Sequence, residues 1–165
     1  MIEVTVEHLG LDQNSKSPVV VLQEKNGQRV LPIWIGPAEA SAIAMELAGV
    51  KFARPLTHDL MRQVILGLGA QLRRVVITKV QDNTYYAALE IRRDDHVIQI
   101  DARPSDSIAI ALRLAAPIFT DEGLLDQAAS GPTIREEKPD TALEPDELKK
   151  HLQDLDPEDF GKFTP

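Results

Sequence analysis

The chain contains no cysteine among its 165 residues. This absence excludes disulfide bonds, thiolate nucleophiles and zinc sites built on sulfur. Long hydrophobic runs are also missing, since no apolar stretch approaches the roughly 20 residues that a membrane-spanning helix needs. The first ten residues lack the basic and apolar regions of a signal peptide. We therefore expect a soluble, cytoplasmic protein that does not enter a membrane.

The sequence motifs of several large enzyme classes are absent as well. The chain has no P-loop, no GxGxxG, no HExxH, no EF-hand loop and no GxSxG. Their absence removes ATPases, dinucleotide enzymes, zinc proteases and α/β-hydrolases as first interpretations. Any catalysis would have to use carboxylates, histidine or hydroxyl groups.

The negative charge is unevenly distributed along the chain. The formal net charge is −8, but residues 1–126 carry 13 basic and 16 acidic side chains, whereas residues 127–165 carry 5 and 10. Residues 127–141 are rich in glycine, proline and charge, which is typical of a linker, and residues 144–155 are predicted to form an exposed helix. We therefore predict an α+β domain over residues 1–126 and an acidic linker with a C-terminal helical tail over residues 127–165.

The near-neutral domain has a group of basic residues on its predicted middle strands. They can form a basic strip that faces a phosphate backbone, or they can be solvated side chains on separate strand faces. The group consists of Arg73, Arg74, Lys79, Arg92, Arg93 and Arg103.

Two segments 67 residues apart, 37–48 and 104–115, are nearly the same sequence without a gap. They share a proline, Ala-Ile-Ala and Leu-Ala, and each has an acid two residues after the proline. Proline is favoured at a helix start, and a carboxylate in the first turn opposes the helix dipole. Two helices that begin at Pro37 and Pro104 are therefore predicted, with Ile43, Ala44, Leu47, Ala48 and Ile110, Ala111, Leu114, Ala115 on their buried faces.

A strand-turn-strand pattern precedes each of these helices. The fold prediction is α+β, with a largely antiparallel sheet and two pseudo-repeated hairpin-helix (ββα) halves. Chance similarity is the alternative, because alanine and leucine are common in helices. Asn26-Gly27 predicts a tight type I′ turn in the first hairpin. The predicted strands cover residues 2–9, 18–23, 29–35, 71–80, 85–91 and 96–102, with a short edge strand at 118–120 and a further helix at 57–66.

A first polar cluster lies in residues 54–60, at the start of the helix predicted over 57–66. One interpretation is structural: Thr57 caps the helix, Asp59 opposes its dipole and His58 is exposed. The other is functional: His58 and Asp59 face a cleft as a general base or as metal ligands.

A second polar cluster lies in residues 101–107, where a strand turns into a helix. Asp101 and Asp106 could share one divalent cation, and Arg103 suits a phosphate. In the structural alternative, Ser105 is the N-cap and Arg103 pairs with Asp101. Together the two clusters hold the ingredients of metal-assisted phosphodiester hydrolysis, provided that they meet in space.

Three runs, LPIWIGPAEASAIAMEL, RPLTHDL and DARPSDSIAIALR, resemble in this order the bifunctional nuclease (BFN) domain family. The resemblance covers about residues 1–126 and implies a compact α+β domain with DNase and RNase activity. The polar residues of these motifs are Glu39, Arg54, Thr57, His58, Asp59, Asp101, Arg103, Ser105 and Asp106.

The sequence-based hypothesis is a nuclease-type phosphodiesterase that acts on DNA and RNA with a divalent metal, Mg²⁺ or Mn²⁺. The candidate catalytic residues are His58, Asp59, Asp101, Arg103 and Asp106. The candidate substrate-binding residues are Arg54, Thr57 and Ser105, and the candidate metal ligands are Glu39, Asp101 and Asp106. The alternative is a non-catalytic, anion- or ligand-binding regulatory domain. A third option is a structural homo-oligomer, which the exposed valine-rich hairpin at residues 18–23 and the edge strand at 118–120 suggest. A homo-oligomer is also the expected assembly of the chain.

Overall fold

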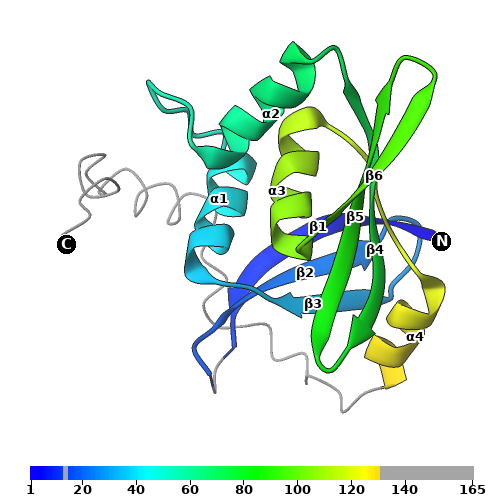
Figure 1. The fold of residues 1–165 in the computed structure, drawn as a ribbon. Helices are drawn as coiled ribbons and strands as arrows, with labels where there is room; N and C mark the ends of the chain where they lie inside the picture. The colour runs from blue at the N-terminus through cyan, green and yellow to red at the C-terminus, as the bar shows by residue number, and fades with distance from the viewer. Residues whose placement is uncertain (13–14, 131–165) are drawn as a thin grey trace.

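The computed structural model describes residues 1–12 and 15–130 as one sheet with four helices (Figure 1). The strands are β1 (Ile2–Leu11), β2 (Pro18–Glu24), β3 (Val30–Trp34), β4 (Gln71–Gln81), β5 (Thr84–Arg93), β6 (His96–Ala102) and β7 (Ile118–Thr120). The helices are α1 (Pro37–Leu47), α2 (Thr57–Gly67), α3 (Pro104–Leu114) and α4 (Glu122–Ser130).

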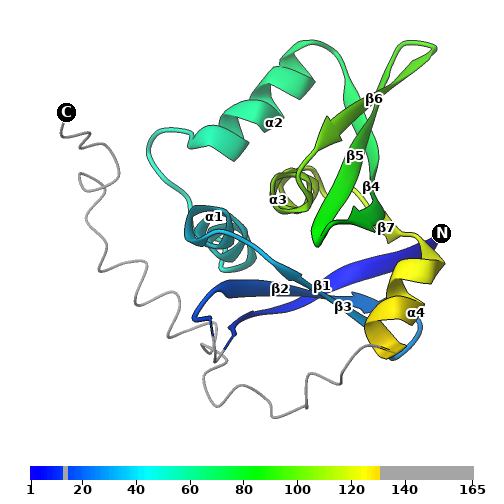
Figure 2. The ribbon, with the colours of Figure 1, turned by 60° about the horizontal axis from the view of Figure 1, so that its bottom comes forward.

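The sheet joins two antiparallel meanders through one short strand. Its strand order is β3-β2-β1-β7-β4-β5-β6. β7 is antiparallel to β1 and parallel to β4, whereas every other pair of neighbours is antiparallel. Helix α3 lies between α1 and the β4–β6 meander (Figure 2). The predicted α+β class with a largely antiparallel sheet is confirmed.

The prediction of an edge strand at residues 118–120 is wrong, because β7 lies in the interior of the sheet. Ile118 is 4% exposed and Thr120 is fully buried. The backbone N–H of Val75 donates to the Pro117 carbonyl at 3.0 Å, which starts the pairing of β7 with β4. Three residues are enough to fill the gap between the two meanders, and the sheet edges are instead β3 and β6.

Both proline helices begin where the sequence predicts. Gly36 and Arg103 are their N-caps and have extended backbones, with φ/ψ of −74°/158° and −69°/145°. A residue before proline is restricted to this region, so the proline sets both the end of the preceding segment and the first helical turn.

The predicted buried faces of these helices are confirmed except at the helix C-termini. Ile43 and Ala111 are fully buried, as predicted, but Leu47 is 48% exposed and Ala115 is exposed. Ala115 adopts a left-handed C-cap conformation, with φ of 50°, which ends α3 beyond the packed region. Both discrepant residues lie at the ends of their helices, where the periodic pattern continues after the packing stops.

The hairpins β2–β3 and β5–β6 each lead into a proline helix, which is the topology that the pseudo-repeat requires. The pseudo-repeat itself stays a prediction. The predicted type I′ turn at Asn26-Gly27 is wrong, since neither residue has a positive φ. A longer loop is closed there by the Glu24 N–H, which donates to the Arg29 carbonyl at 2.9 Å, and by the paired side chains of the same two residues.

The hairpin at residues 18–23 is not the exposed apolar surface that we expected. Val20 and Leu22 are fully buried in the core beneath α1.

Helix α4 continues past the predicted domain boundary at residue 126, and its Leu125 is fully buried. The predicted linker beyond Ser130 and the predicted helix at 144–155 lie outside the described residues.

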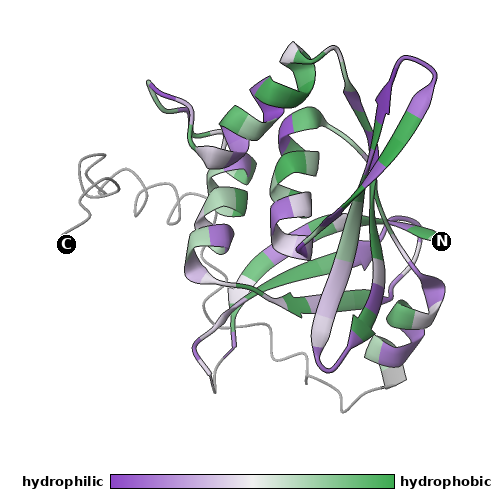
Figure 3. Cartoon of the chain, in the orientation of Figure 1, coloured by the Kyte–Doolittle hydropathy of each residue, from purple (hydrophilic) through white to green (hydrophobic). Residues whose placement is uncertain are grey.

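Hydrophilic residues gather at the tip of the β5–β6 hairpin (Figure 3). In residues 1–12 and 15–130, no helix has the length and apolarity needed to cross a bilayer.

Candidate active site

The first turns of three helices meet at one end of α3. Glu39 and Asp106 are the third residues of α1 and α3, and His58 is the second residue of α2. Helices α1 and α2 both pack against α3 (Figure 1). His58 from the first turn of α2 contacts Asp106, and Glu39 from the first turn of α1 contacts Arg103, the N-cap of α3. The two polar clusters of the sequence therefore contact each other, as the functional interpretation required.

Four side chains form a continuous chain of polar contacts, here called the helix-start cluster (Glu39, His58, Arg103 and Asp106). His58 Nε2 lies 2.9 Å from Asp106 Oδ1, and Arg103 Nε donates to Asp106 Oδ2 at 2.7 Å. Arg103 Nη1 lies 2.8 Å from Glu39 Oε1. Arg103 therefore pairs with Asp106, and the predicted pairing with Asp101 is wrong.

Asp106 is an ionised hydrogen-bond acceptor at neutral pH. Burial alone would raise its pKa, but the hydrogen bonds from Arg103 and His58 outweigh burial and hold the pKa below its ordinary value of 3.8. A carboxylate at this position accepts a hydrogen bond from His58 Nε2–H, which leaves Nδ1 as the nitrogen with a free lone pair in the neutral ring. His58 Nδ1 has no hydrogen-bond partner among the described residues.

The side chains of the helix-start cluster differ in their exposure to solvent. The His58 side chain is 13% exposed, whereas the Arg103 side chain is 66% exposed. Two of the three nitrogens of Arg103 are bound to carboxylates, and Nη2 has no partner in the described part of the chain. A guanidinium with one free edge at the surface is suited to an oxygen of a phosphate group.

Asp59, which lies next to His58, points to a different partner. Its Oδ1 accepts from Arg113 Nε at 2.6 Å, and its Oδ2 accepts from the backbone N–H of Leu56 at 3.0 Å. The Arg113 side chain is only 4% exposed and also donates to the backbone carbonyls of Ala42 and Ala109. The geometry assigns Asp59 to a structural ion pair that ties α2 to α1 and α3.

The N-caps predicted at Thr57 and Ser105 are wrong. The caps are Leu56 and Arg103, one and two residues earlier. Asp59 caps α2 from inside its first turn, and Pro104 takes the first helical position of α3. Thr57 is exposed, and Ser105 is 6% exposed against the cluster.

Two further candidates lie outside the cluster. Asp101 is exposed on β6, opposite Ala88 in the strand pairing, and Arg54 is exposed in the connection before α2. Neither side chain forms a hydrogen bond or an ion pair with another described residue. Their predicted roles in catalysis and substrate binding therefore gain no support from this geometry.

The predicted metal ligands do not form a ready cation site. Glu39 and Asp106 are both bound to Arg103, so a guanidinium lies where the shared cation was expected. Asp101, the third predicted ligand, is not part of the cluster. Residues 1–12 and 15–130 contain no group of three or more histidine, aspartate or glutamate side chains placed to hold a metal ion.

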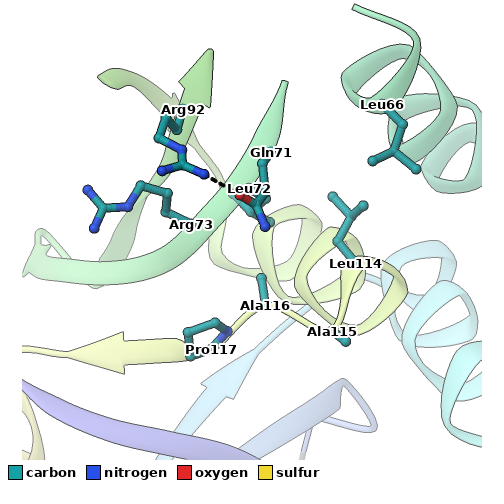
Figure 4. A pocket seen from close by; sticks show the side chains of 9 residues that line it. All are labelled: Leu66, Gln71, Leu72, Arg73, Arg92, Leu114, Ala115, Ala116 and Pro117. Carbon is teal, nitrogen blue, oxygen red and sulfur yellow. Dashed lines mark hydrogen bonds between the residues drawn. The ribbon is translucent and has the colours of Figure 1, made fainter. Parts of the chain in front are cut away.

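The predicted basic strip is divided among separate environments. Arg74 is paired with Glu90 through Nε at 2.6 Å and Nη2 at 2.8 Å, and Arg103 belongs to the helix-start cluster. Arg73 and Arg92 instead line a cavity of about 410 Å³ beside the C-terminal ends of α2 and α3 (Figure 4). This cavity is at the opposite end of α3 from Asp106.

Sequence reasoning missed Arg113, although a signal was present. Arg113 occupies the position in the second repeated segment that Glu46 occupies in the first. Opposite charges at equivalent positions on two adjacent helices indicate a pair, and their Nε and Oε2 atoms are 3.8 Å apart. Trp34 and Tyr85, which lie beside the cluster, were missed because each is one residue of an ordinary strand pattern.

We predict that stability falls in acid through Asp59 and Asp106. The pKa of Asp59 is also below 3.8, since burial, which raises it, is outweighed by the bonds from Arg113 and Leu56. A carboxyl whose pKa is lowered by folding stabilises the folded chain above its unfolded pKa, and this contribution is lost as the pH falls through 3.8 toward the folded value. Thermal unfolding between pH 7 and pH 3 measures the loss. Asp59→Asn should flatten the curve, and parallel curves for the two proteins would contradict the prediction.

Comparison with known proteins supports one family. The family model for the bifunctional nuclease domain matches residues 20–132, a range that contains the whole helix-start cluster. An uncharacterized protein of Mycobacterium tuberculosis (strain ATCC 25618 / H37Rv) is 46% identical over 164 residues, which cover 97% of this chain and 98% of that protein.

Plant relatives that match part of the chain carry a functional name. Bifunctional nuclease 2 of Oryza sativa subsp. japonica is 30% identical over 112 residues, 66% of this chain and 34% of that protein. Bifunctional nuclease 1 of Arabidopsis thaliana is 29% identical over 105 residues, 61% of this chain and 32% of that protein. The chain thus spans about a third of the length of each of these two plant relatives.

Proposed function

Since this chain belongs to the bifunctional nuclease domain family, we propose that it is a nuclease that hydrolyses phosphodiester bonds of DNA and RNA at the helix-start cluster. The observation that supports this most is the contact between His58 and Asp106, because it joins a base to the group that orients it. These residues are 48 positions apart and come from two separate family motifs. The plant relatives are named bifunctional nucleases, which supports a nucleic-acid substrate for this chain too.

In the proposed reaction His58 acts as the general base. Its Nδ1 takes a proton from a water molecule, the water oxygen forms a bond to phosphorus, and the bond from phosphorus to the leaving sugar oxygen breaks. The proton on His58 is then available to the leaving oxygen, so protons and charge balance. Asp106 holds the ring through Nε2 and stabilises the imidazolium, and Arg103 Nη2 binds a non-bridging oxygen on which charge develops.

The formal charges of the cluster indicate what else the substrate needs. Glu39 and Asp106 each contribute −1 and Arg103 contributes +1, which leaves −1 with a neutral His58. A polyanion therefore requires further positive charge at the site, and a divalent cation that arrives with the substrate is one source. Metal dependence stays a prediction, as do the cytoplasmic location and the homo-oligomeric state.

A cleavage assay of the purified chain tests the proposal. End-labelled single-stranded DNA and RNA are incubated with excess protein, with Mg²⁺, with Mn²⁺ and with EDTA. Cleavage that follows the protein through the last purification step supports a nuclease, and its loss in EDTA supports metal dependence. If excess protein leaves both substrates intact in every condition, the nuclease proposal fails and the non-catalytic anion-binding domain becomes the better interpretation.

Arg103→Lys should reduce cleavage about tenfold or more. An ammonium group cannot bridge Glu39 and Asp106 and also present a free edge to a phosphate. The effect should appear in single-turnover cleavage rates, at an unchanged midpoint of urea unfolding. Arg62→Lys is the matched control, because Arg62 is exposed on α2 and its Nε donates only to the Arg113 carbonyl. Equal rates for Arg103→Lys and the wild type would argue against a phosphate contact at Arg103.

A further inference from the structure

A cavity of about 260 Å³ opens directly beside the helix-start cluster. It lies between the end of β3, the β4–β5 turn and the first turns of α1 and α3. Pockets that take drug-sized ligands measure roughly 300–1,000 Å³, so this cavity suits one small ring system. The lining residues that matter here are Trp34, Asn83, Tyr85, Arg103 and Ser105.

Aromatic side chains are scarce in this chain, yet two of them line this cavity. Aromatic residues make up 4% of the sequence, and Trp34 is the single tryptophan. Trp34 is 47% exposed on the edge strand β3, and its Nε1 donates to Asp12 Oδ2 at 3.2 Å, which fixes the ring. An exposed aromatic ring that is held in place by a hydrogen bond is a ready stacking surface.

Two residues that line the same cavity carry polar groups without partners among the described residues. The Tyr85 hydroxyl and the Asn83 amide have no hydrogen-bond partner among the described residues. Burial raises the pKa of Tyr85, so its hydroxyl remains a donor. Asp82 and Asn83 have φ of 49° and 57° and form the tight turn between β4 and β5, from which Asn83 lines the cavity. An amide and a hydroxyl can bind the edge of a nucleobase, which carries both donors and acceptors.

We propose that this cavity is a nucleobase subsite, which takes one unpaired base of the substrate, stacked on Trp34, while Arg103 binds the adjoining phosphate. Arg103 belongs to both the cavity and the cluster, so the base and the scissile phosphate are neighbours on one strand. The assignment rests on the proposed function for its ligand class, which is nucleic acid. A stacked base must leave its duplex, so the subsite favours single strands over duplexes.

The single tryptophan makes binding directly observable. The His58→Ala chain, in which the proposed mechanism leaves cleavage too slow to consume the strand, is titrated with a hexathymidylate and with a matched abasic oligonucleotide. We expect the hexathymidylate to quench Trp34 fluorescence to saturation, the abasic strand to leave it nearly unchanged, and a duplex to quench less than a single strand. Absence of quenching at saturation, with binding verified by anisotropy of a labelled strand, would overturn the subsite.

Variants separate stacking from other contacts. Trp34→Ala should weaken hexathymidylate binding about tenfold in the anisotropy assay, and Trp34→Phe should retain most of the affinity. Tyr86→Ala is the matched control, because Tyr86 is the next residue on β5 after Tyr85 and its ring lies under Lys79 instead, with Nζ 4.7 Å from the ring centroid. Wild-type affinity for Trp34→Ala, or an equal loss for Tyr86→Ala, would overturn the proposal.

The outcomes distinguish this proposal from the nuclease proposal. If base-dependent quenching is observed but the wild-type chain does not cleave, the nucleobase-subsite proposal stands and the nuclease proposal is wrong. If the chain cleaves and Trp34→Ala does not change the cleavage rate, the nuclease proposal stands and the nucleobase-subsite proposal is wrong. If neither oligonucleotide binds, the nucleobase-subsite proposal is wrong, whatever the cleavage assay shows.

Discussion

His58→Ala is expected to lower the rate of phosphodiester cleavage by about 10²–10⁴-fold, the usual contribution of a general base. Asp106 and Glu39 are both bound to Arg103, and the lowered pKa of Asp106 makes it a weak proton acceptor. His58 Nδ1, which has no partner among the described residues, is therefore the candidate base of the helix-start cluster. Single-turnover cleavage of an end-labelled single strand measures the effect.

The matched control for this prediction is His96→Ala. His96 is exposed on β6, away from the helix starts, and forms no ion pair with a described residue. Its variant should cleave at the wild-type rate, and both variants should unfold at the wild-type urea concentration. A His58→Ala chain that cleaves within a factor of three of the wild type would exclude His58 as the base.

Arg113→Leu should destabilise the fold by about 3 kcal/mol, since removal of one partner from a buried ion pair typically costs 3–5 kcal/mol. The Arg113 side chain is 4% exposed and donates to Asp59 at 2.6 Å and to the carbonyls of Ala42 and Ala109 at 3.1 and 3.0 Å. Its loss leaves Asp59 without its ion-pair partner and removes the side-chain links to the Ala42 and Ala109 carbonyls. Urea unfolding followed by far-UV circular dichroism measures the change in the free energy of unfolding.

Arg62→Ala supplies the comparison for this stability effect. Arg62 is exposed on α2, and its Nε donates only to the Arg113 carbonyl, at 3.1 Å. We expect a cost below about 1 kcal/mol. A double-mutant cycle of Arg113→Leu with Asp59→Asn should show strong coupling, because the two residues share one interaction. Additive effects would mean that the Asp59 contact contributes nothing to stability.

The sequence predicted the local elements of the fold well where a single residue controls the backbone. Pro37 and Pro104 start α1 and α3 because proline fixes its own φ and restricts the residue before it. The place of β7 could not be predicted in this way. β7 is an interior strand because it pairs with both β1 and β4, which are distant in the sequence. No local sequence pattern indicates these pairings.

The candidate site was predicted in its residue types more than in its contacts. His58, Arg103 and Asp106 were identified as chemistry-bearing residues, and the structure brings them together. The sequence could not show that the neighbouring Asp59 faces another partner. Adjacent residues in a first helical turn point in directions about 100° apart, so the packing of α2 on α3 decides which of the two reaches Asp106.

Equivalent positions of the two repeated segments meet across α1 and α3. Glu39 and Asp106, which align in the repeat, both bind Arg103, and Glu46 lies near Arg113, its own counterpart. A symmetric origin would account for this arrangement, because two related helices packed side by side bring the same positions together. The two repeated segments differ at this position, where the first has the acidic Glu46 and the second has the basic Arg113.

Single-turnover cleavage by the wild type and by Asp106→Asn, assayed across the same size-exclusion peak, tests the proposed active site most directly. An asparagine keeps the size of Asp106 but can turn its amide group toward His58 Nε2, which moves the ring proton to Nδ1 and removes the base. We expect wild-type cleavage to follow the protein peak, and Asp106→Asn to lose it by at least about 10²-fold at unchanged stability. Equal cleavage in the two peaks, or none in either, would contradict a nuclease site built on His58, Asp106 and Arg103.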